Sequence, residues 1–146
     1  IKAYHFGGVL MKISTNSRYA LRLLARVAQK EGERVTTSAA ALAEGISEKM
    51  LERIAAKLTR EGFLISVKGI RGGYVLARPA ESMTVSQVLK VMETPYLPHH
   101  CIEQAEKNCK MSGECSMLWL WRRVDEAICS VTDHVTIADI MRQDSF

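Results

Sequence analysis

Residues 45–77, which read GISEKMLERIAAKLTREGFLISVKGIRGGYVLA, decide the fold of this chain. Gly45 suits a tight turn and Ser47 suits a helix cap, so we expect a helix to begin directly after them. Apolar residues at spacings of three and four predict that this helix covers residues 48–60. They form one buried stripe, made of Leu51, Ile54, Ala55 and Leu58.

A hairpin is expected directly after this helix. Residues 63–67 and 74–77 read as two strands, because β-branched and aromatic residues dominate them. The turn between them, residues 68–73, holds three glycines, a lysine and an arginine. Such a turn can lie close to a phosphate backbone, because glycine permits positive φ and adds no side chain.

The residues before the helix predict a helix-turn-helix. Residues 38–44 are rich in alanine and favour a second, short helix. Ala41, Gly45 and Leu51 have the spacing of that motif: a small residue at the helix contact, a glycine in the turn and an apolar anchor. Many helical hairpins contain this triplet, but the hairpin that follows makes the whole pattern that of a winged helix-turn-helix domain.

Shorter helices are expected on either side of this unit. The first begins near Thr15 and Asn16, ends near Gly32 and presents one apolar face, made of Leu21, Leu24, Val27 and Ala28. Another opens at Thr84, where the sequence has the form of a capping box, and continues to residue 91 or 92. We expect residues 94–100 not to be helical and the segment up to residue 115 to be polar and irregular.

A long helix is predicted over residues 116–133, with a final turn over 137–141. Its apolar residues recur with a period near 3.5, which favours pairing with a second chain. They are Leu118, Trp121, Val124, Ile128, Val131 and Val135. Packing against the chain's own body is the alternative. Trp119 and Trp121 are interpreted as core or interface residues.

The predicted fold class is therefore mainly α with a small β wing. We expect four parts: an added or upstream extension at 1–10, a winged-helix DNA-binding domain at 11–92, a cysteine-bearing cluster loop at 93–115, and a dimerisation helix with its C-terminal turn at 116–141.

The amino-acid composition is typical of a globular domain. The chain has 146 residues, of which 47% are hydrophobic and 25% are charged, as in ordinary globular domains. No apolar run is long enough to span a membrane and no signal-peptide pattern is present, so a cytoplasmic location is expected. A chain of this length buries roughly two-thirds of its unfolded surface, so it needs no disulfide and its four cysteines require another explanation.

Charge is unevenly distributed along the chain. Residues 11–78 hold 13 lysines and arginines against 6 acidic residues, a balance of +7, whereas residues 79–146 hold 6 against 10, a balance of −4. This asymmetry suggests that the first half faces a polyanion, with an ordinary solvated surface as the alternative.

Duplex DNA is the polyanion that the motifs favour. A helix fits the major groove, where side chains near its first turn reach base edges, and basic residues farther along contact phosphates. A dimer is expected to read a palindromic operator, with binding sensitive to salt. The candidate DNA-binding residues are Ser47, Glu48, Lys49, Met50, Glu52, Arg53, Lys57, Lys68, Arg71, Gly72 and Tyr74.

Three cysteines predict a metal site. Cys101, Cys109 and Cys115 are separated by seven and five residues, wider than the spacing of a zinc ribbon and suited to an iron–sulfur cluster of the 2Fe–2S or 4Fe–4S type. His99 or His100, a residue of another chain or an exogenous ligand would complete it. A reversible disulfide and zinc occupancy are the alternatives. Cys129 is interpreted as a packing residue.

These features together resemble the winged-helix transcription regulators that include IscR, NsrR, RirA and CymR. The resemblance covers residues 11 to about 141 and is carried by MKIS at 11–14, RYAL at 18–21, GISEKMLE at 45–52, VKG at 67–69, GGYVLA at 72–77, the spaced cysteines, Leu118–Trp119 and Thr136–Ile137. It implies a dimeric regulator whose long helices cross at the interface and whose wing meets the minor groove. In many members three cysteines bind an iron–sulfur cluster.

The chain departs from the family pattern at specific positions. Leu118 stands where IscR-like members place a histidine as the fourth ligand, and Arg18 stands where NsrR-like members use an aspartate. Met50 replaces a common aromatic residue, and Arg71 replaces a common wing glycine. Neither known fourth ligand is therefore present at its usual position.

Three functions are consistent with parts of this pattern. The first is a DNA-binding regulator, acting as a repressor, that senses iron, redox state or nitric oxide through the cluster. The second is the same regulator without a cluster, using a thiol switch, a metabolite or a protein effector. The third is a thiol oxidoreductase, which the sequence disfavours because it has no cysteine pair spaced by two residues and no nucleophile–base pattern.

Overall fold

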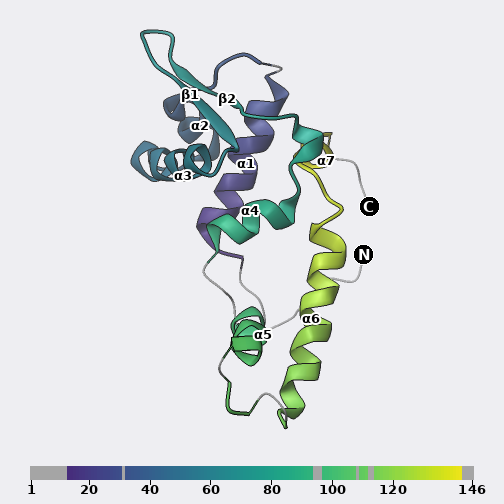
Figure 1. Cartoon of the computed structure of the whole chain (residues 1–146). Helices are drawn as coiled ribbons and strands as arrows, with labels where there is room; N and C mark the ends of the chain where they lie inside the picture. Colours follow the sequence, from purple (N-terminus) through teal and green to yellow (C-terminus); the bar gives the residue numbers. More distant parts are fainter. Residues whose placement is uncertain (1–12, 31, 94–96, 108, 112–113, 143–146) are drawn as a thin grey trace.

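The computed structural model describes residues 13–30, 32–93, 97–107, 109–111 and 114–142, and Figure 1 shows their arrangement. In these ranges it is mainly helical, with one two-stranded antiparallel sheet, which confirms the predicted fold class. The elements are α1 (Thr15–Gln29), α2 (Thr37–Glu44), α3 (Glu48–Arg60), β1 (Leu64–Val67), β2 (Gly73–Leu76), the 3-10 helix η1 (Ala80–Ser82), α4 (Val85–Met92), α5 (Leu97–Lys107), α6 (Ser116–Thr132) and α7 (Ile137–Arg142).

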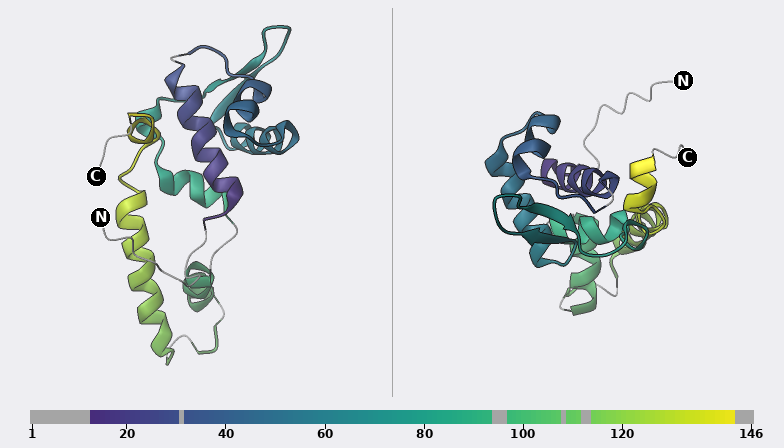
Figure 2. Two further views of the ribbon diagram at one scale, coloured as in Figure 1. Left: turned by 180° about the vertical axis from the view of Figure 1, so that it is seen from behind. Right: turned by 90° about the horizontal axis from the view of Figure 1, so that it is seen from above.

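Two regions are distinct in space. The body comprises α1 to α4, the β1–β2 hairpin, η1 and α7, while the arm comprises α5 and α6, which pack on each other and extend away from the body (Figures 1 and 2). None of the helices in the described ranges is long and apolar enough to cross a membrane.

Helix starts in the body follow short polar side chains. The Ser47 hydroxyl accepts a hydrogen bond from the Met50 N–H at 3.3 Å, and Thr84 with Gln87 forms the predicted capping box. α1 begins at Thr15, as predicted, but its cap is Ser14, whose hydroxyl accepts from the Ser17 N–H at 3.1 Å, one residue before the predicted capping residues.

The core lies between α1, α3, the hairpin and α4. Its largest fully buried side chains are Leu23, Leu24, Leu51, Leu58, Leu64, Met83, Val88, Ile137 and Ser17. All four residues of the stripe predicted for α3 are buried. On α1 the buried face is centred on Leu23 and Leu24, and the predicted Leu21 and Ala28 are only half-buried.

The chain returns to the body after the arm. Thr136 pairs with Thr84 in an isolated β-bridge, and the Val85 N–H donates to the Val135 carbonyl at 2.9 Å. Ile137 and Ala138 then enter the core. The arm is therefore inserted between α4 and α7, two elements that pack in one core.

One secondary-structure prediction was wrong. Residues 97–107 form α5, although the segment from 94 to 115 was expected to be non-helical and irregular. Pro98 lies in the first turn of α5, where a missing N–H removes no intrahelical hydrogen bond, so proline is tolerated there. Cys101 is consequently a helical residue.

Candidate functional sites

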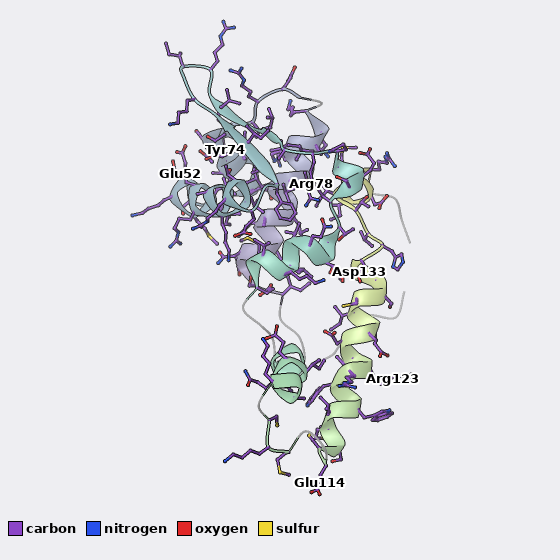
Figure 3. The ribbon with its side chains drawn as sticks, viewed as in Figure 1. Glu52, Tyr74, Arg78, Glu114, Arg123 and Asp133 are labelled. Atoms are coloured by element: carbon purple, nitrogen blue, oxygen red, sulfur yellow. The ribbon has the colours of Figure 1, made fainter. Side chains whose placement is uncertain are left out.

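The outer face of α3 presents most of the residues predicted to bind DNA. Ser47, Glu48, Lys49, Glu52 and Arg53 are exposed. Figure 3 shows Glu52 on α3, on the side of the molecule away from the arm. Met50 and Lys57 are half-buried, and Met50 packs against the core, so its contribution to a surface is smaller than its position near the helix start suggests.

The hairpin projects on the same side of the body as α3 (Figures 1 and 2). Lys68 and Arg71 are exposed near its tip, and Gly72 lies in the turn. Tyr74 is half-buried against the core, and its backbone pairs with Val35 through two hydrogen bonds of 2.9 and 3.0 Å. This third strand-like contact was not predicted, because it is an isolated bridge and no run of strand residues surrounds Val35.

Among the described residues, the basic side chains predicted to bind DNA have no acidic partner. Across the described ranges, no salt bridge involves Lys49, Arg53, Lys57, Lys68 or Arg71. Three arginines elsewhere in the body are engaged: Arg22 and Arg26 both contact Glu44, at 2.9 and 2.8 Å, and Arg78 lies over the Phe63 ring at 4.9 Å. The five cations of α3 and the hairpin are thus available to an anion that approaches this side of the body.

The start of α1 joins α3 to the end of α4. A groove of about 240 Å³ is lined by Asn16, Met50, Arg53, Ile54, Lys57 and Met92. Beside it, the Ser14 N–H donates to the Glu93 carboxylate at 2.8 Å. Glu93 is the last described residue before the segment that leads to the arm. The sequence gives no signal for this contact, because its partners are 79 residues apart.

Three cysteines line one cavity in the arm. Cys101 lies on α5, Cys109 follows that helix and Cys115 is the residue that precedes α6. The cavity has a volume of about 340 Å³, and its other lining residues are Gln104, Ala105, Met117, Leu118 and Trp121. Trp121, predicted to be a core or interface residue, is therefore a wall of the cysteine cavity.

The donor set suits a thiophilic group. All the cysteines are free, and the partial positive charge at the start of α6 stabilises an anionic ligand next to Cys115. Among the described side chains, no group of three histidines, cysteines or carboxylates converges as a single-ion site. The side chains of His99 and His100 lie outside the described part, so a fourth ligand from them stays a prediction.

The long helix carries two apolar rows that share Val124 and Val131. Of the predicted stripe, Leu118 and Trp121 line the cysteine cavity, and Met117 of the second row lies at the same cavity. The second row recurs at spacings of three and four, and its residues are exposed or half-buried: Met117, Leu120, Val124, Ala127 and Val131. Trp119, also exposed, lies apart from this row.

Cys129 lies where α6 approaches α4, half-buried and separate from the other cysteines. Burial raises the pKa of its thiol, and the nearby Asp125 and Asp133 carboxylates raise the pKa further, against a smaller opposing effect of Lys90. A raised pKa keeps this thiol protonated, which agrees with a packing role.

Comparison with known proteins covers nearly the whole chain. Residues 13–143 match the model of the Rrf2 family, described as an iron-dependent transcriptional regulator. The chain is 33% identical to protein rrf2 of Nitratidesulfovibrio vulgaris over 136 residues, 92% of this chain and 90% of the relative. It is 32% identical to the HTH-type transcriptional regulator CymR of Bacillus subtilis over 131 residues, 89% of either protein.

Solved structures agree with the sequence matches. CymR (YrzC), the global cysteine regulator of B. subtilis, superposes with a TM-score of 0.72 at 26% identity, covering 93% of this chain and 100% of that one. IscR of T. potens superposes with a TM-score of 0.70 at 28% identity, covering 92% of this chain and 89% of that one.

Proposed function

Because the chain belongs to the Rrf2 family of transcriptional regulators, we propose that it binds a palindromic operator as a homodimer and senses iron, redox state or nitric oxide through an iron–sulfur cluster. Its relatives are DNA-binding regulators and not enzymes. The observation that carries the sensing part is the shared cavity of Cys101, Cys109 and Cys115.

For DNA binding, α3 enters the major groove with its first turn toward the base edges. Glu48 and Glu52 accept hydrogen bonds from cytosine amino groups, while Lys49 and Arg53 contact bases or phosphates. Lys57 contacts phosphate, and Lys68 and Arg71 follow the flanking backbone. What supports this assignment is that these five cations are exposed or half-buried and lack acidic partners in the described part of the chain.

The homodimer forms through the accessible row on α6. Met117, Leu120, Val124, Ala127 and Val131 have the alternating spacing of three and four that lets two helices interdigitate. Such a row is self-complementary, so a two-fold axis across it places the α3 helices and hairpins of the two protomers in equivalent positions. Each protomer then contacts one half-site of the operator.

For sensing, the thiolates of Cys101 on α5, Cys109 after that helix and Cys115 before α6 would hold the cluster. A bound cluster would supply redox and iron-dependent chemistry that the chain alone lacks. Because the three ligands come from both ends of the α5–α6 pair, their ligation would tie the two helices together, and losing it would loosen that tie.

The test of the sensing function is anaerobic purification with iron and sulfide assays and a visible spectrum. We expect broad absorption near about 400 nm, typical of thiolate-bound clusters. The Cys101→Ala, Cys109→Ala, Cys115→Ala protein should lack this absorption, and the matched control Cys129→Ala should retain it. Stoichiometric zinc or no metal would contradict the cluster.

The test of the DNA-binding function is selection from a randomised duplex library, followed by footprinting. We expect two protected half-sites related by symmetry and a steep loss of affinity as salt rises. A single unpaired half-site would contradict the dimeric geometry. Tight operator binding that does not change with cluster content would favour a regulator that uses a disulfide or another effector.

A further inference from the structure

A second groove of the body lies where α1 ends, between β2, η1 and α7. Its volume is about 830 Å³, and it is open to solvent. α7 packs on both α1 and η1, and Figure 1 shows this contact on the side of the body away from α3. The groove shares no lining residue with the cysteine cavity or with the set predicted to bind DNA. It is therefore a separate candidate site.

Two opposite charges meet at this groove without completing a hydrogen bond. Glu81 of η1 and Arg142 at the end of α7 both line it, and the distance from Arg142 Nη2 to Glu81 Oε1 is 3.5 Å. Charge-assisted hydrogen bonds of this kind are about 2.7–2.9 Å long. Both side chains are exposed, and the nearby Asp139 carboxylate is occupied by Thr136, which donates to it at 2.6 and 2.8 Å. Glu81 and Arg142 can therefore each bind a charged group of a ligand.

The outer edge of β2 presents unpaired backbone groups beside these charges. The Ala77 N–H donates to the Phe63 carbonyl on the β1 side at 3.0 Å, whereas Tyr74 pairs with Val35 on the opposite edge. Because alternate residues of a strand direct their backbone groups to the same edge, Leu76 shares the edge of Tyr74. Among the described residues, no backbone hydrogen bond uses the Leu76 N–H or carbonyl. Leu76, which lines the groove, therefore offers one donor and one acceptor there.

The rest of the groove combines an apolar wall with a helix end. The wall comes from α1, β2 and α7, through Val27, Ala28, Val75 and Met141. Gln29, the last residue of α1, also lines the groove, and the C-terminal end of a helix carries partial negative charge. A ligand at this place would meet a cation, an anion, a free backbone edge and an apolar surface.

We propose that this groove binds a free α-amino acid with an apolar side chain. Such a ligand carries its carboxylate and its ammonium group on one carbon atom, so both reach two side chains that are themselves 3.5 Å apart. Arg142 binds the carboxylate, and Glu81 binds the ammonium group together with the end of α1. Leu76 adds backbone hydrogen bonds, and the side chain of the ligand packs on the apolar wall. The site requires neither DNA nor a cluster, so the inference goes beyond the proposed function.

The same features disfavour other classes of small molecule. A monoamine or a monocarboxylate leaves one of the two charged side chains without a partner, and a dicarboxylate brings like charge to Glu81. The termini of a peptide of several residues are too far apart to bind both side chains at once. Glycine satisfies both charges but leaves the apolar wall in contact with water.

The experiment is isothermal titration calorimetry of the full-length protein with L-leucine, L-valine, L-methionine and L-phenylalanine. The tightest of these probes is then compared with its amide, its N-acetyl derivative and glycine. We expect one site per protomer and at least about tenfold weaker binding of each of the three comparison compounds. Each loses either a charge-assisted contact or the burial of an apolar side chain, and either loss exceeds the free energy of a tenfold change.

Two variants assign the charges to their residues. Glu81→Gln should weaken binding at least about tenfold and remove the difference between the amino acid and its N-acetyl derivative. Arg142→Gln should weaken binding by a similar factor and remove the difference between the amino acid and its amide. Glu61→Gln and Arg123→Gln, at exposed positions outside the groove, are the matched controls and should bind as wild type. Because all four positions are exposed, circular dichroism should match wild type in each case.

Two results would overturn the inference: no probe that binds with a Kd below about 10 mM, or groove variants that bind the amino acid as wild type does. Either result leaves the proposed function intact, since the cluster spectrum and the operator selection do not involve Glu81 or Arg142. Conversely, a protein that holds no cluster or selects no operator can still bind the amino acid. The two failures are therefore distinguishable.

Discussion

The body and the arm bury their apolar residues to different extents. In the body, Leu23, Leu24, Leu51 and Leu58 are at most 1% exposed. In the arm, α6 has no buried residue, and Trp119 stays 69% exposed. Most helix stability in proteins comes from packing an apolar face, so the body is complete as a monomer and the arm is not. In the proposed homodimer, a partner helix and the group bound by the three cysteines would supply the second layer of the arm.

The largest expected effect lies in the body. Leu58→Ala empties a fully buried position in α3 and should lower the free energy of unfolding by about 2–5 kcal/mol. Urea unfolding followed by circular dichroism measures this change. The matched arm variant Val131→Ala, at a position 59% exposed, should cost no more than about 0.5 kcal/mol in dilute protein. Equal losses at the two positions would contradict the distinction between body and arm.

The second effect concerns self-association of the arm. Leu120→Glu places a carboxylate in the accessible apolar row of α6 and should weaken dimerisation at least about tenfold, because an interface buries that charge without a partner. Sedimentation equilibrium measures it. Glu126→Gln, on the opposite face of α6, serves as the control and should leave the dimer intact. A Leu120→Glu protein that remains dimeric would show that the dimer interface does not include this row of α6.

A smaller effect tests the connection between α1 and α2. Glu44 is 10% exposed at its side chain and holds both Arg22 and Arg26, so Glu44→Gln should cost about 1–2 kcal/mol. Glu81→Gln removes the longer, exposed contact to Arg142 at 3.5 Å and should cost less than about 0.5 kcal/mol. Thermal unfolding of both variants compares them. If Glu81→Gln is the more costly, burial does not govern these ion pairs.

The smallest effect occurs where the arm meets the body. The raised pKa of Cys129 means that its reactive thiolate forms only at higher pH than in an unfolded peptide. Alkylation of Cys129, followed by peptide mass mapping, should therefore be slow near neutral pH and accelerate later in a pH series than alkylation of the denatured chain. Asp133→Asn should move the acceleration toward lower pH. Identical profiles for folded and denatured protein would contradict the effect of burial and neighbouring carboxylates.

Local signals predicted the body more completely than the arm. Ser47, the α3 stripe and the glycines of the turn act over a few residues, so the sequence predicts α3 and the hairpin correctly. In the arm, Pro98 suggested a loop, because its position in the first turn of a helix cannot be recognised before the helix itself is known. The sequence therefore missed α5 and with it the position of Leu118 and Trp121 at the cysteine cavity.

In the candidate sites, too, the sequence predicts the features that local patterns mark and misses those that depend on tertiary packing. Residue type and spacing identified Cys101, Cys109 and Cys115, but only the packing of α5 on α6 shows that they line one cavity. Contacts between distant residues gave no local pattern at all. The Arg34 contact to the hairpin, the Glu44 contact to two arginines and the Glu93 contact to Ser14 all depend on tertiary structure.

The two attachments of the arm have a kinematic consequence. Before the arm, Glu93 is hydrogen-bonded to Ser14 at the start of α1, and after it, Thr136 is paired with Thr84 ahead of α4. A rigid segment held at one point can rotate about any axis through that point, whereas a segment held at two points can rotate only about the line that joins them. The bridge of Thr136 to Thr84 and the packing of α6 on α4 hold one end of the arm, and the Glu93–Ser14 hydrogen bond holds the chain up to residue 93, so free rotation about a single attachment is excluded while these contacts last.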